Sequence, residues 1–442
     1  MRRSTMLRRS AAVLAISLLA AACGGGADPA ETETGTPTET ETTESTETET
    51  ETETESAATG QSIDGTLKIG TLLPQTGDLA VLGPAMTEAV QLAVEQINEA
   101  GGVLGNDVEL VLGDDGTNED VANDTTDRLI QSERVDAIIG AAASRITLAV
   151  IDKITGAGIV QCSPSNTGSS LTDYEDDVPG FYFRTAPPDN LQGPALADVI
   201  VGDANATVAV IALNDEYGQG FAEFLKQGLE EAGAEIVADV AYDPAGQDFS
   251  ADVQEVVDSG ADAVAVIAFP DTGVKIITGL LEGGYSPDQL YTADGMQGDA
   301  VITDVNPDDP AGLNGMKGTA PSSQGSAEFS AAFEEFKQPD TAQIFSAHAY
   351  DCAIITALAA AIAGTDDPAA IAAEMVGVTR DGEKCTDFAS CIELIDAGTD
   401  IDYDGASGPG EWVPEGEPAA GTYEVWEFRD GAVNTLSTVD VG

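Results

Sequence analysis

The chain has 442 residues, with 78 acidic side chains against 17 basic ones, so its formal net charge at pH 7 is −61. Such a charge argues against binding to nucleic acid, which needs a basic surface, and it is typical of a strongly hydrated protein, as in a salty medium. The only histidine, His348, falls in a helical pattern and is interpreted as a half-buried helix residue. A His-based metal cluster and a Ser-His-Asp catalytic arrangement are therefore not expected.

The first residues predict an export signal. Arginines precede the apolar run AAVLAISLLAAA, which ends directly before Cys23. A basic start, a short apolar core and small residues before the cut are typical of a secretory signal. The cysteine at the cut favours a bacterial lipoprotein, so we expect removal of residues 1–22, a lipid on Cys23 and a position on the extracellular face of the cell membrane. An ordinary signal peptide cleaved near Ala22 is the alternative.

Residues 23–62 are predicted to be a tether that does not fold. Glutamates alternate with threonines here, with no large apolar side chain to form a core. A flexible coil of this length spans roughly 35 Å. After the signal we find no apolar segment of 18 residues, so no further membrane crossing is expected.

From residue 67 onward, apolar runs alternate with segments of helical spacing. A first series holds the strands LKIGTLL, DVELVLGD, VDAIIG and AGIVQ, with helices at 84–100, 119–131 and 144–155. A second series holds the strands ATVAVIAL, AEIVADVAY, DAVAVIAF and QLYTAD, with helices at 191–200, 218–232, 248–259 and 272–283. This alternation predicts buried parallel sheets with helices on both faces. Two series predict an α/β protein with two doubly wound, Rossmann-like lobes.

The rest of the chain is predicted to pass back and forth between the two lobes. Helical patterns at 327–336, 343–363 and 368–376 precede the strand pair TYEVWEF and VNTLST. The proline- and glycine-bearing segments 183–190, 318–323 and 405–412 are candidate crossings. We therefore expect residues 63–185 plus 320–405 to form lobe I, and 186–319 plus 406–442 to form lobe II.

Four cysteines remain beyond the signal: Cys162, Cys352, Cys385 and Cys391. An even number in an exported protein predicts disulfides. The short spacing of Cys385 and Cys391 makes them the first pair, which leaves Cys162 with Cys352. Four cysteines allow three pairings, and buried free thiols are the alternative.

One segment matches a calcium-loop pattern. Asp400, Asp402, Asp404, Gly405 and Glu411 stand at the spacings of an EF-hand loop. However, a proline interrupts the loop, and EWVPEGEP after it is not a helix. A solvated Asp/Gly turn is the preferred interpretation, and no metal or other cofactor is predicted.

The ends of the strands suggest a binding site, because ligands of open α/β sheets lie outside the carboxyl ends of the strands. Ser144 follows one strand at the start of a helix, where it can cap the helix and where free N–H groups favour an anion. Ser165, Asn166 and Thr167 follow the next strand and add neutral donors. These groups suit a carboxylate.

Strand ends of the second series supply the complementary groups. Asp294 could accept hydrogen bonds from an ammonium group, and Tyr217 and Phe269 could flank an apolar part. The site predicted is a clamp for a small amino-acid-like zwitterion.

The order of several motifs also resembles a known family. The segments LKIGTLLPQTGDLAVLG, INEAGGVLGNDVELVLGDD, GAAASRITLAVID, IVQCSPSNTGSSLT, FYFRTAPPDNLQG and LNDEYGQGF are similar to the extracellular solute-binding proteins of branched-chain amino-acid-type ABC transporters. This resemblance implies a type I periplasmic-binding fold, in which two lobes joined by three crossovers close on a ligand. It also implies a monomeric, non-enzymatic protein that docks on an ABC permease.

The resemblance implies roles for single residues. Ser144 and the loop Ser165 to Thr167 match positions that bind the ligand carboxylate. Tyr217 matches a tyrosine of the cleft, Phe269 falls near an aromatic position, and Asp294 matches the acid that takes the ammonium. Leu82 stands where amino-acid binders often have an aromatic, which leaves the ligand side chain open.

We therefore expect a lipid-anchored extracellular solute-binding protein that captures an amino-acid-like ligand and delivers it to a permease. A ligand-sensing module of the same fold that signals to a membrane partner is the alternative. A hydrolase is favoured only by the many carboxylates.

Overall fold

The computed structural model describes residues 63–172, 174, 178–322, 325–339, 341, 343–408 and 410–442. The predicted signal, the lipid attachment at Cys23 and the tether lie outside the described residues. The described residues include both predicted series of strands and the strand pair near the C-terminus.

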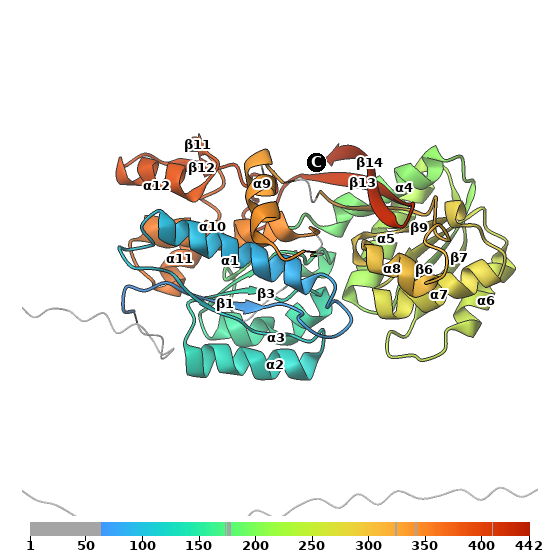
Figure 1. Cartoon of the computed structure of the whole chain (residues 1–442), viewed down its shortest axis with the longest axis horizontal. Coiled ribbons are helices and arrows are strands. Elements are labelled where there is room, and N and C mark those ends of the chain that lie inside the picture. The colour runs from blue at the N-terminus through green and yellow to red at the C-terminus, as the bar shows by residue number, and fades with distance from the viewer. Residues whose placement is uncertain are drawn as a thin grey trace, which may run out of the picture. The chain divides into compact units, whose positions relative to one another are not determined.

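The first sheet is parallel throughout, in the order β2-β1-β3-β4-β5. Its strands are β1 (Lys68–Leu72), β2 (Glu109–Val111), β3 (Ala137–Gly140), β4 (Val160–Ser163) and β5 (Tyr182–Arg184). The helices between them are α1 (Gly83–Glu99), α2 (Glu119–Asp127), which continues as a π-helix (Arg128–Glu133), and α3 (Ser144–Gly156). Figure 1 shows α1 on one face of this sheet and α2 and α3 on the other. Both faces are covered, and β3 and β4 are accordingly buried along their whole length.

The second sheet has the order β14-β13-β10-β9-β8-β6-β7. Its strands are β6 (Thr207–Leu213), β7 (Glu235–Tyr242), β8 (Ala263–Ile267), β9 (Leu290–Thr292), β10 (Lys317–Pro321), β13 (Gly421–Arg429) and β14 (Ala432–Val441). Its helices are α4 (Asp189–Gly202), α5 (Glu216–Ala232), α6 (Ser250–Ser259), α7 (Pro270–Glu282) and α8 (Asp299–Val305). Only β13 runs against the other strands, so it pairs antiparallel with both β10 and β14, and a tight hairpin joins it to β14 at the edge of the sheet. The two sheets and their helices confirm the predicted pair of doubly wound lobes.

Helices from the later part of the chain return to the first sheet. They are α9 (Ala327–Phe336), α10 (Ser346–Ala363), α11 (Pro368–Glu374) and α12 (Phe388–Asp396), with the small parallel pair β11 (Glu383–Cys385) and β12 (Ile401–Tyr403). α10 packs along α1 and over β3 and β4. The chain therefore passes between the two sheets three times, while the lobe boundaries expected from the sequence stay a prediction.

Helix α10 corrects one expectation. It has 18 residues and is apolar enough to cross a membrane by length and composition, although no such segment was expected after the signal. However, 83% of it is buried inside the folded protein. Its many alanines allow close packing against α1 and the first sheet, so it serves as a core helix. His348 on this helix is also more buried than expected, with 3% of its surface exposed.

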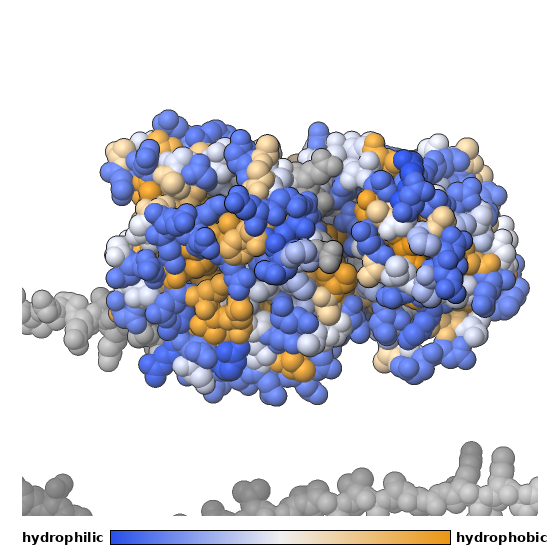
Figure 2. Space-filling view, in the orientation of Figure 1, coloured by the Kyte–Doolittle hydropathy of each residue, from blue (hydrophilic) through white to orange (hydrophobic). Residues whose placement is uncertain are grey.

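The surface agrees with the composition. Figure 2 shows hydrophilic residues over most of the face drawn, with apolar residues in separate patches. Few large apolar side chains are strongly exposed among the described residues, and Ile63 is the most exposed of those, at 59%.

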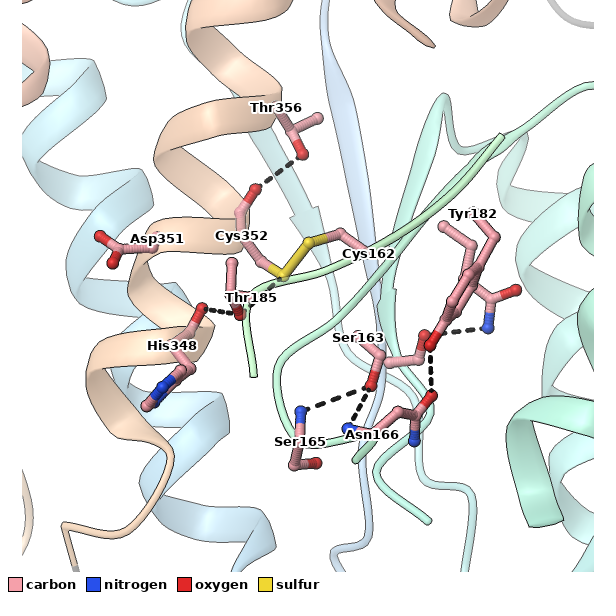
Figure 3. The surroundings of a disulfide bond; sticks show 12 residues. Cys162, Ser163, Ser165, Asn166, Tyr182, Thr185, His348, Asp351, Cys352 and Thr356 are labelled. Carbon is pink, nitrogen blue, oxygen red and sulfur yellow. Dashed lines mark hydrogen bonds between the residues drawn. A yellow bond between two sulfur atoms is a disulfide. The ribbon is translucent and has the colours of Figure 1, made fainter. Parts of the chain in front are cut away.

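Two disulfides lie in the described chain. Cys385 bonds to Cys391 across six positions, whereas Cys162 bonds to Cys352 across 190 positions. The second bond fixes α10 to β4, as Figure 3 shows. In the chain, β4 comes before strands β6–β10 of the second sheet and α10 comes after them. The disulfide therefore closes a loop that contains all five of these parallel strands.

We predict that these two disulfides differ in their effect on stability. Removing a cross-link restores chain entropy to the unfolded state, and the gain increases with loop length. Cys162→Ala with Cys352→Ala should lower the free energy of unfolding by about 5 kcal/mol, and Cys385→Ala with Cys391→Ala, the matched control, by about 2 kcal/mol. Urea unfolding measures both, and equal losses would contradict the loop-length account.

Candidate functional site

A small cavity lies where the strand ends of both lobes meet. Its volume is about 20 Å³, room for about one water molecule. Seven of the eight side chains expected at the ligand line it, and Asn166 does not. The full lining is Leu79, Leu82, Ala142, Ala143, Ser144, Ser165, Thr167, Tyr217, Phe269, Asp294, Gly295 and Phe345.

Ser144 begins α3 at the cavity wall. The expectation that it caps the helix by its side chain is wrong, since the N-cap is Ala143 and no side chain caps the helix there. Instead, Ser144 Oγ accepts a hydrogen bond of 3.2 Å from the backbone N–H of Gly168. The first helical bonds come from Ile146 and Thr147 to Ala143 O, so the N–H groups before them point out of the helix end. This end favours an anion.

The loop after β4 is bonded mainly to itself and to the end of β3. Ser163 Oγ donates to Ala141 O at 2.7 Å and accepts from the backbone of Asn166 at 3.1 Å. The Asn166 amide donates to Ala142 O at 2.8 Å and accepts from the Tyr182 hydroxyl at 3.0 Å (Figure 3). Asn166 therefore shapes the loop, and the structure gives its side chain no place on the cavity wall.

The backbone at Gly168 passes so close to Ser144 that only glycine fits there. A Cβ atom on Gly168 would lie 2.9 Å from Ser144 Oγ, closer than such contacts normally come. A residue without a side chain lets the loop reach the start of α3, so that Ser144, Ser165 and Thr167 face the same space.

A buried ion pair fixes the loop after β4 on the side away from the cavity. Arg184, at the end of β5, is fully buried and bonds to Glu417 through Nε at 2.9 Å and also through a terminal nitrogen. Its other terminal nitrogen donates to the carbonyl oxygens of Asn166, at 3.3 Å, and Gly168, at 2.9 Å. Because these carbonyls flank Thr167, Arg184 fixes the loop without touching the cavity. The sequence patterns did not identify Arg184, although it stands in the motif FYFRTAPPDN.

The second lobe faces these donors with an acid. Asp294 Oδ1 accepts from Gln192 Nε2 at 3.0 Å and from the Tyr217 hydroxyl at 3.2 Å. Burial raises the pKa of Asp294 to about 6, while the bonds from Gln192 and Tyr217 lower it. The carboxyl is therefore mainly ionised at pH 7 and protonated in mild acid.

A second acid, Asp189, lies behind the cavity at the start of α4. It is fully buried. Burial, and then the charge of Asp294, raise its pKa well above the usual range. A hydrogen bond from the Thr167 side chain and the charge of Arg184 oppose these effects only in part, so the neutral form of Asp189 is favoured.

Aromatic and aliphatic side chains form the rest of the wall. The rings of Tyr217 and Phe269 stack with centroids 5.2 Å apart and planes 3° from parallel. Leu79 and Leu82 come from the loop before α1, and Phe345 stands at the N-cap of α10. Phe345 has φ 58°, a left-handed conformation that costs free energy in a residue with a side chain. The sequence predicted Leu82 at the site but missed Phe345, because the fold brings it there from a distant helix.

The calcium-loop pattern forms a different structure. Asp402 and Asp404 both bond to Lys384 Nζ, at 2.8 Å and 2.9 Å. Within the described ranges, no group of three His, Cys, Asp or Glu residues is placed to hold a metal ion. The carboxylates of this loop thus find their counter-charge in a lysine of β11.

The comparison with protein families agrees with this geometry. Residues 66–423 match the model of the family described as periplasmic binding protein. The chain belongs to this family. Its members are binding proteins and not enzymes, as the resemblance in the sequence predicted.

Relatives of this periplasmic binding protein include two of known role. The chemotactic signal transduction system substrate-binding protein BasB of Halobacterium salinarum is 27% identical, over 85% of this chain and 90% of its own. The leucine-, isoleucine-, valine-, threonine-, and alanine-binding protein of Pseudomonas aeruginosa is 27% identical, over 70% of this chain and 81% of its own.

Solved structures share the fold. The leucine binding protein LivK of Thermotoga maritima has a TM-score of 0.70 at 23% identity, over 84% of this chain and 98% of its own. The branched-chain amino acid transporter substrate binding protein LivJ of Streptococcus pneumoniae, solved with isoleucine, has a TM-score of 0.69 at 22% identity, over 85% of this chain and 99% of its own. Both support the type I periplasmic-binding fold.

We predict that Arg184 and Glu417 position the loop more than they stabilise the fold. Glu417→Ala leaves a buried charge unpaired and should lower the free energy of unfolding by about 3–5 kcal/mol. Replacing both residues by methionine should cost less, because no buried charge remains. Binding of an amino-acid panel should nevertheless weaken in the double variant, since Asn166 O and Gly168 O lose their donor. Denaturation and calorimetry measure the two effects, and full affinity in the double variant would argue against positioning.

Proposed function

We propose that this protein captures a small amino-acid zwitterion between its lobes. The observation that carries the proposal is the meeting of neutral donors and one acid in a single cavity: Ser144, Ser165 and Thr167 on one side and Asp294 on the other. The donors would bind the carboxylate, for which the Ser165 hydroxyl must turn away from Ala142 O, to which it donates at 3.1 Å. Asp294 with Tyr217 would take the ammonium group. No basic residue lines the cavity among the described residues, so a carboxylate there would depend on hydrogen bonds and on the end of α3.

The cavity wall indicates the kind of side chain that the ligand carries. Leu79, Leu82, Phe269 and Phe345 present carbon atoms, which favours an aliphatic group. A leucine-, isoleucine-, valine-, threonine-, and alanine-binding relative supports this class. Because the present cavity holds only about one water, the ligand would enter an open form, and the lobes would close on it about the three crossings.

We further propose that the protein is anchored by a lipid on Cys23 and delivers its ligand to an ABC permease. The sequence before Cys23 supports export and lipidation, and the fold shared with LivJ, a transporter substrate binding protein, supports delivery. A specific observation favours a second candidate: BasB, named for chemotactic signal transduction, matches 85% of this chain. Signalling to a membrane receptor is therefore the alternative.

We predict that amino-acid affinity falls in acid. The ammonium group needs an ionised Asp294, whose pKa of about 6 in the ligand-free protein lies well above that of an ordinary carboxyl. Below pH 6 the carboxyl must lose a proton on binding, so affinity should fall roughly tenfold per pH unit, while α-carboxyl and α-amino groups titrate outside this range. After a thermal-shift screen selects the amino acid, calorimetry at pH 5–7 measures the slope.

The control for this prediction is Asp294→Asn, which keeps the shape and removes the charge. Its affinity should be weak and independent of pH across the same range. A wild-type affinity that does not change between pH 5 and 7 would contradict the assignment of Asp294.

We predict that deleting the gene abolishes uptake of the selected amino acid by the source cells. Wild-type protein should restore uptake, and Cys23→Ala should release the protein from the membrane and reduce uptake. Radiolabelled uptake, fractionation and a chemotaxis assay measure the outcomes. If the deletion strain keeps normal uptake but loses chemotaxis, sensing and not transport is the function of the protein.

A further inference from the structure

A group of charges at the edge of the cavity links the two lobes. Arg145 follows Ser144 on α3, and its Nε lies 3.7 Å from Oδ2 of Asp215. Asp215 precedes α5 of the second lobe and caps this helix by accepting from the backbone of Gly218 at 2.9 Å. The pair thus joins one helix end of each lobe.

Both partners are held in place by their own lobe. An Arg145 terminal nitrogen donates to Thr117 O at 2.8 Å and lies 4.0 Å from Asp78, so the first lobe orients the guanidinium. The Asp215 side chain is 7% exposed. Within the described residues, Arg145 Nε and Asp215 Oδ2 are buried and have no hydrogen-bond partner. The only opposite charge within salt-bridge distance of Asp215 among those residues is Arg145.

The surroundings of this pair are acidic on both sides. Asp78 belongs to the first lobe and Asp271, in the first turn of α7, to the second. Burial raises the pKa of Asp78, the charge of Asp271 raises it further, and Arg145 opposes both. The charge of Arg145 also lowers the pKa of Asp215 against the effect of burial. The structure therefore brings carboxylates of both lobes together. Arg145 of the first lobe and Lys275 of the second, which lies 3.5 Å from Asp271, offset their repulsion.

We propose that Arg145 and Asp215 form a cross-lobe latch that stabilises the closed protein without touching the ligand. The pair can form only when the lobes are closed, so it shifts the equilibrium toward closure whether or not the cavity is filled. The latch rests on the proposed function in one respect, namely that the two lobes open and close. It acts in the protein without ligand.

The test measures closure without any ligand. A fluorophore pair attached through unnatural amino acids at the exposed positions Glu119 on α2 and Glu282 on α7 reports the distance between the lobes. Arg145→Gln should lower the closed-to-open ratio by about two- to fivefold, and Arg145→Lys should restore most of the loss. Asp215→Asn removes the charge but keeps a good helix cap.

The double variant distinguishes a direct pair from two independent effects. Asp215→Asn in the Arg145→Gln background should cause no further opening, because the partner is already lost. Lys153→Gln is the matched control, since Lys153 is another α3 cation whose salt bridge, to Asp127 at 3.1 Å, stays within the first lobe. It should leave closure unchanged.

Three results would overturn the latch. They are an unchanged ratio in Arg145→Gln, additive effects in the double variant, and an equal effect of Lys153→Gln. Melting temperatures of all variants exclude unfolding as the cause. Because no ligand is present, a protein that binds no amino acid but shows the coupling would refute the proposed function and leave the latch intact.

Discussion

In a chain whose net charge is −61, the cavity presents uncharged donors where an anion would have to bind. The start of α3 and the loop after β4 provide hydroxyl and backbone N–H groups whose directions are fixed by packing. The nearby guanidinium of Arg184 is committed to Glu417 and to two loop carbonyls. Its charge therefore acts on the shape of the loop, which keeps neutral donors in place at the cavity.

The opposite side of the cavity depends on two acids with different surroundings. Burial and the charge of Asp294 favour the neutral form of Asp189, whereas Gln192 and Tyr217 donate to Asp294 and favour its ionised form. Two ionised carboxylates so close together would repel each other strongly. Keeping one neutral gives the cavity a single negative charge.

Periodicity and composition predicted the two doubly wound lobes, because buried parallel strands leave continuous apolar runs. Strand ends also led to Ser144, Thr167 and Asp294, because ligands of open α/β sheets lie outside those ends, although the topology of each sheet does not by itself place the ends of the two sheets opposite each other. Phe345 could not be found in this way, because it reaches the wall only after α10 packs back on the first sheet. The side-chain direction of Asn166 depends on hydrogen bonds to Ala141 and Ala142, which no local pattern reveals.

If the ligand is the zwitterion proposed above, it cannot offset the electrostatic cost of closure. Its carboxylate and ammonium cancel, so binding adds no net charge to two lobes that both present carboxylates at the cavity edge. A counter-charge must come from the protein. Arg145 lies beside Asp78 and Asp215, and Lys275 pairs with Asp271 at 3.5 Å. Salt would screen the repulsion between the lobes and the attraction of the pair alike. On this proposal the balance of closure is set by a few fixed charges beside the cavity, while the choice of ligand is left to the neutral donors, Asp294 and the apolar wall inside it.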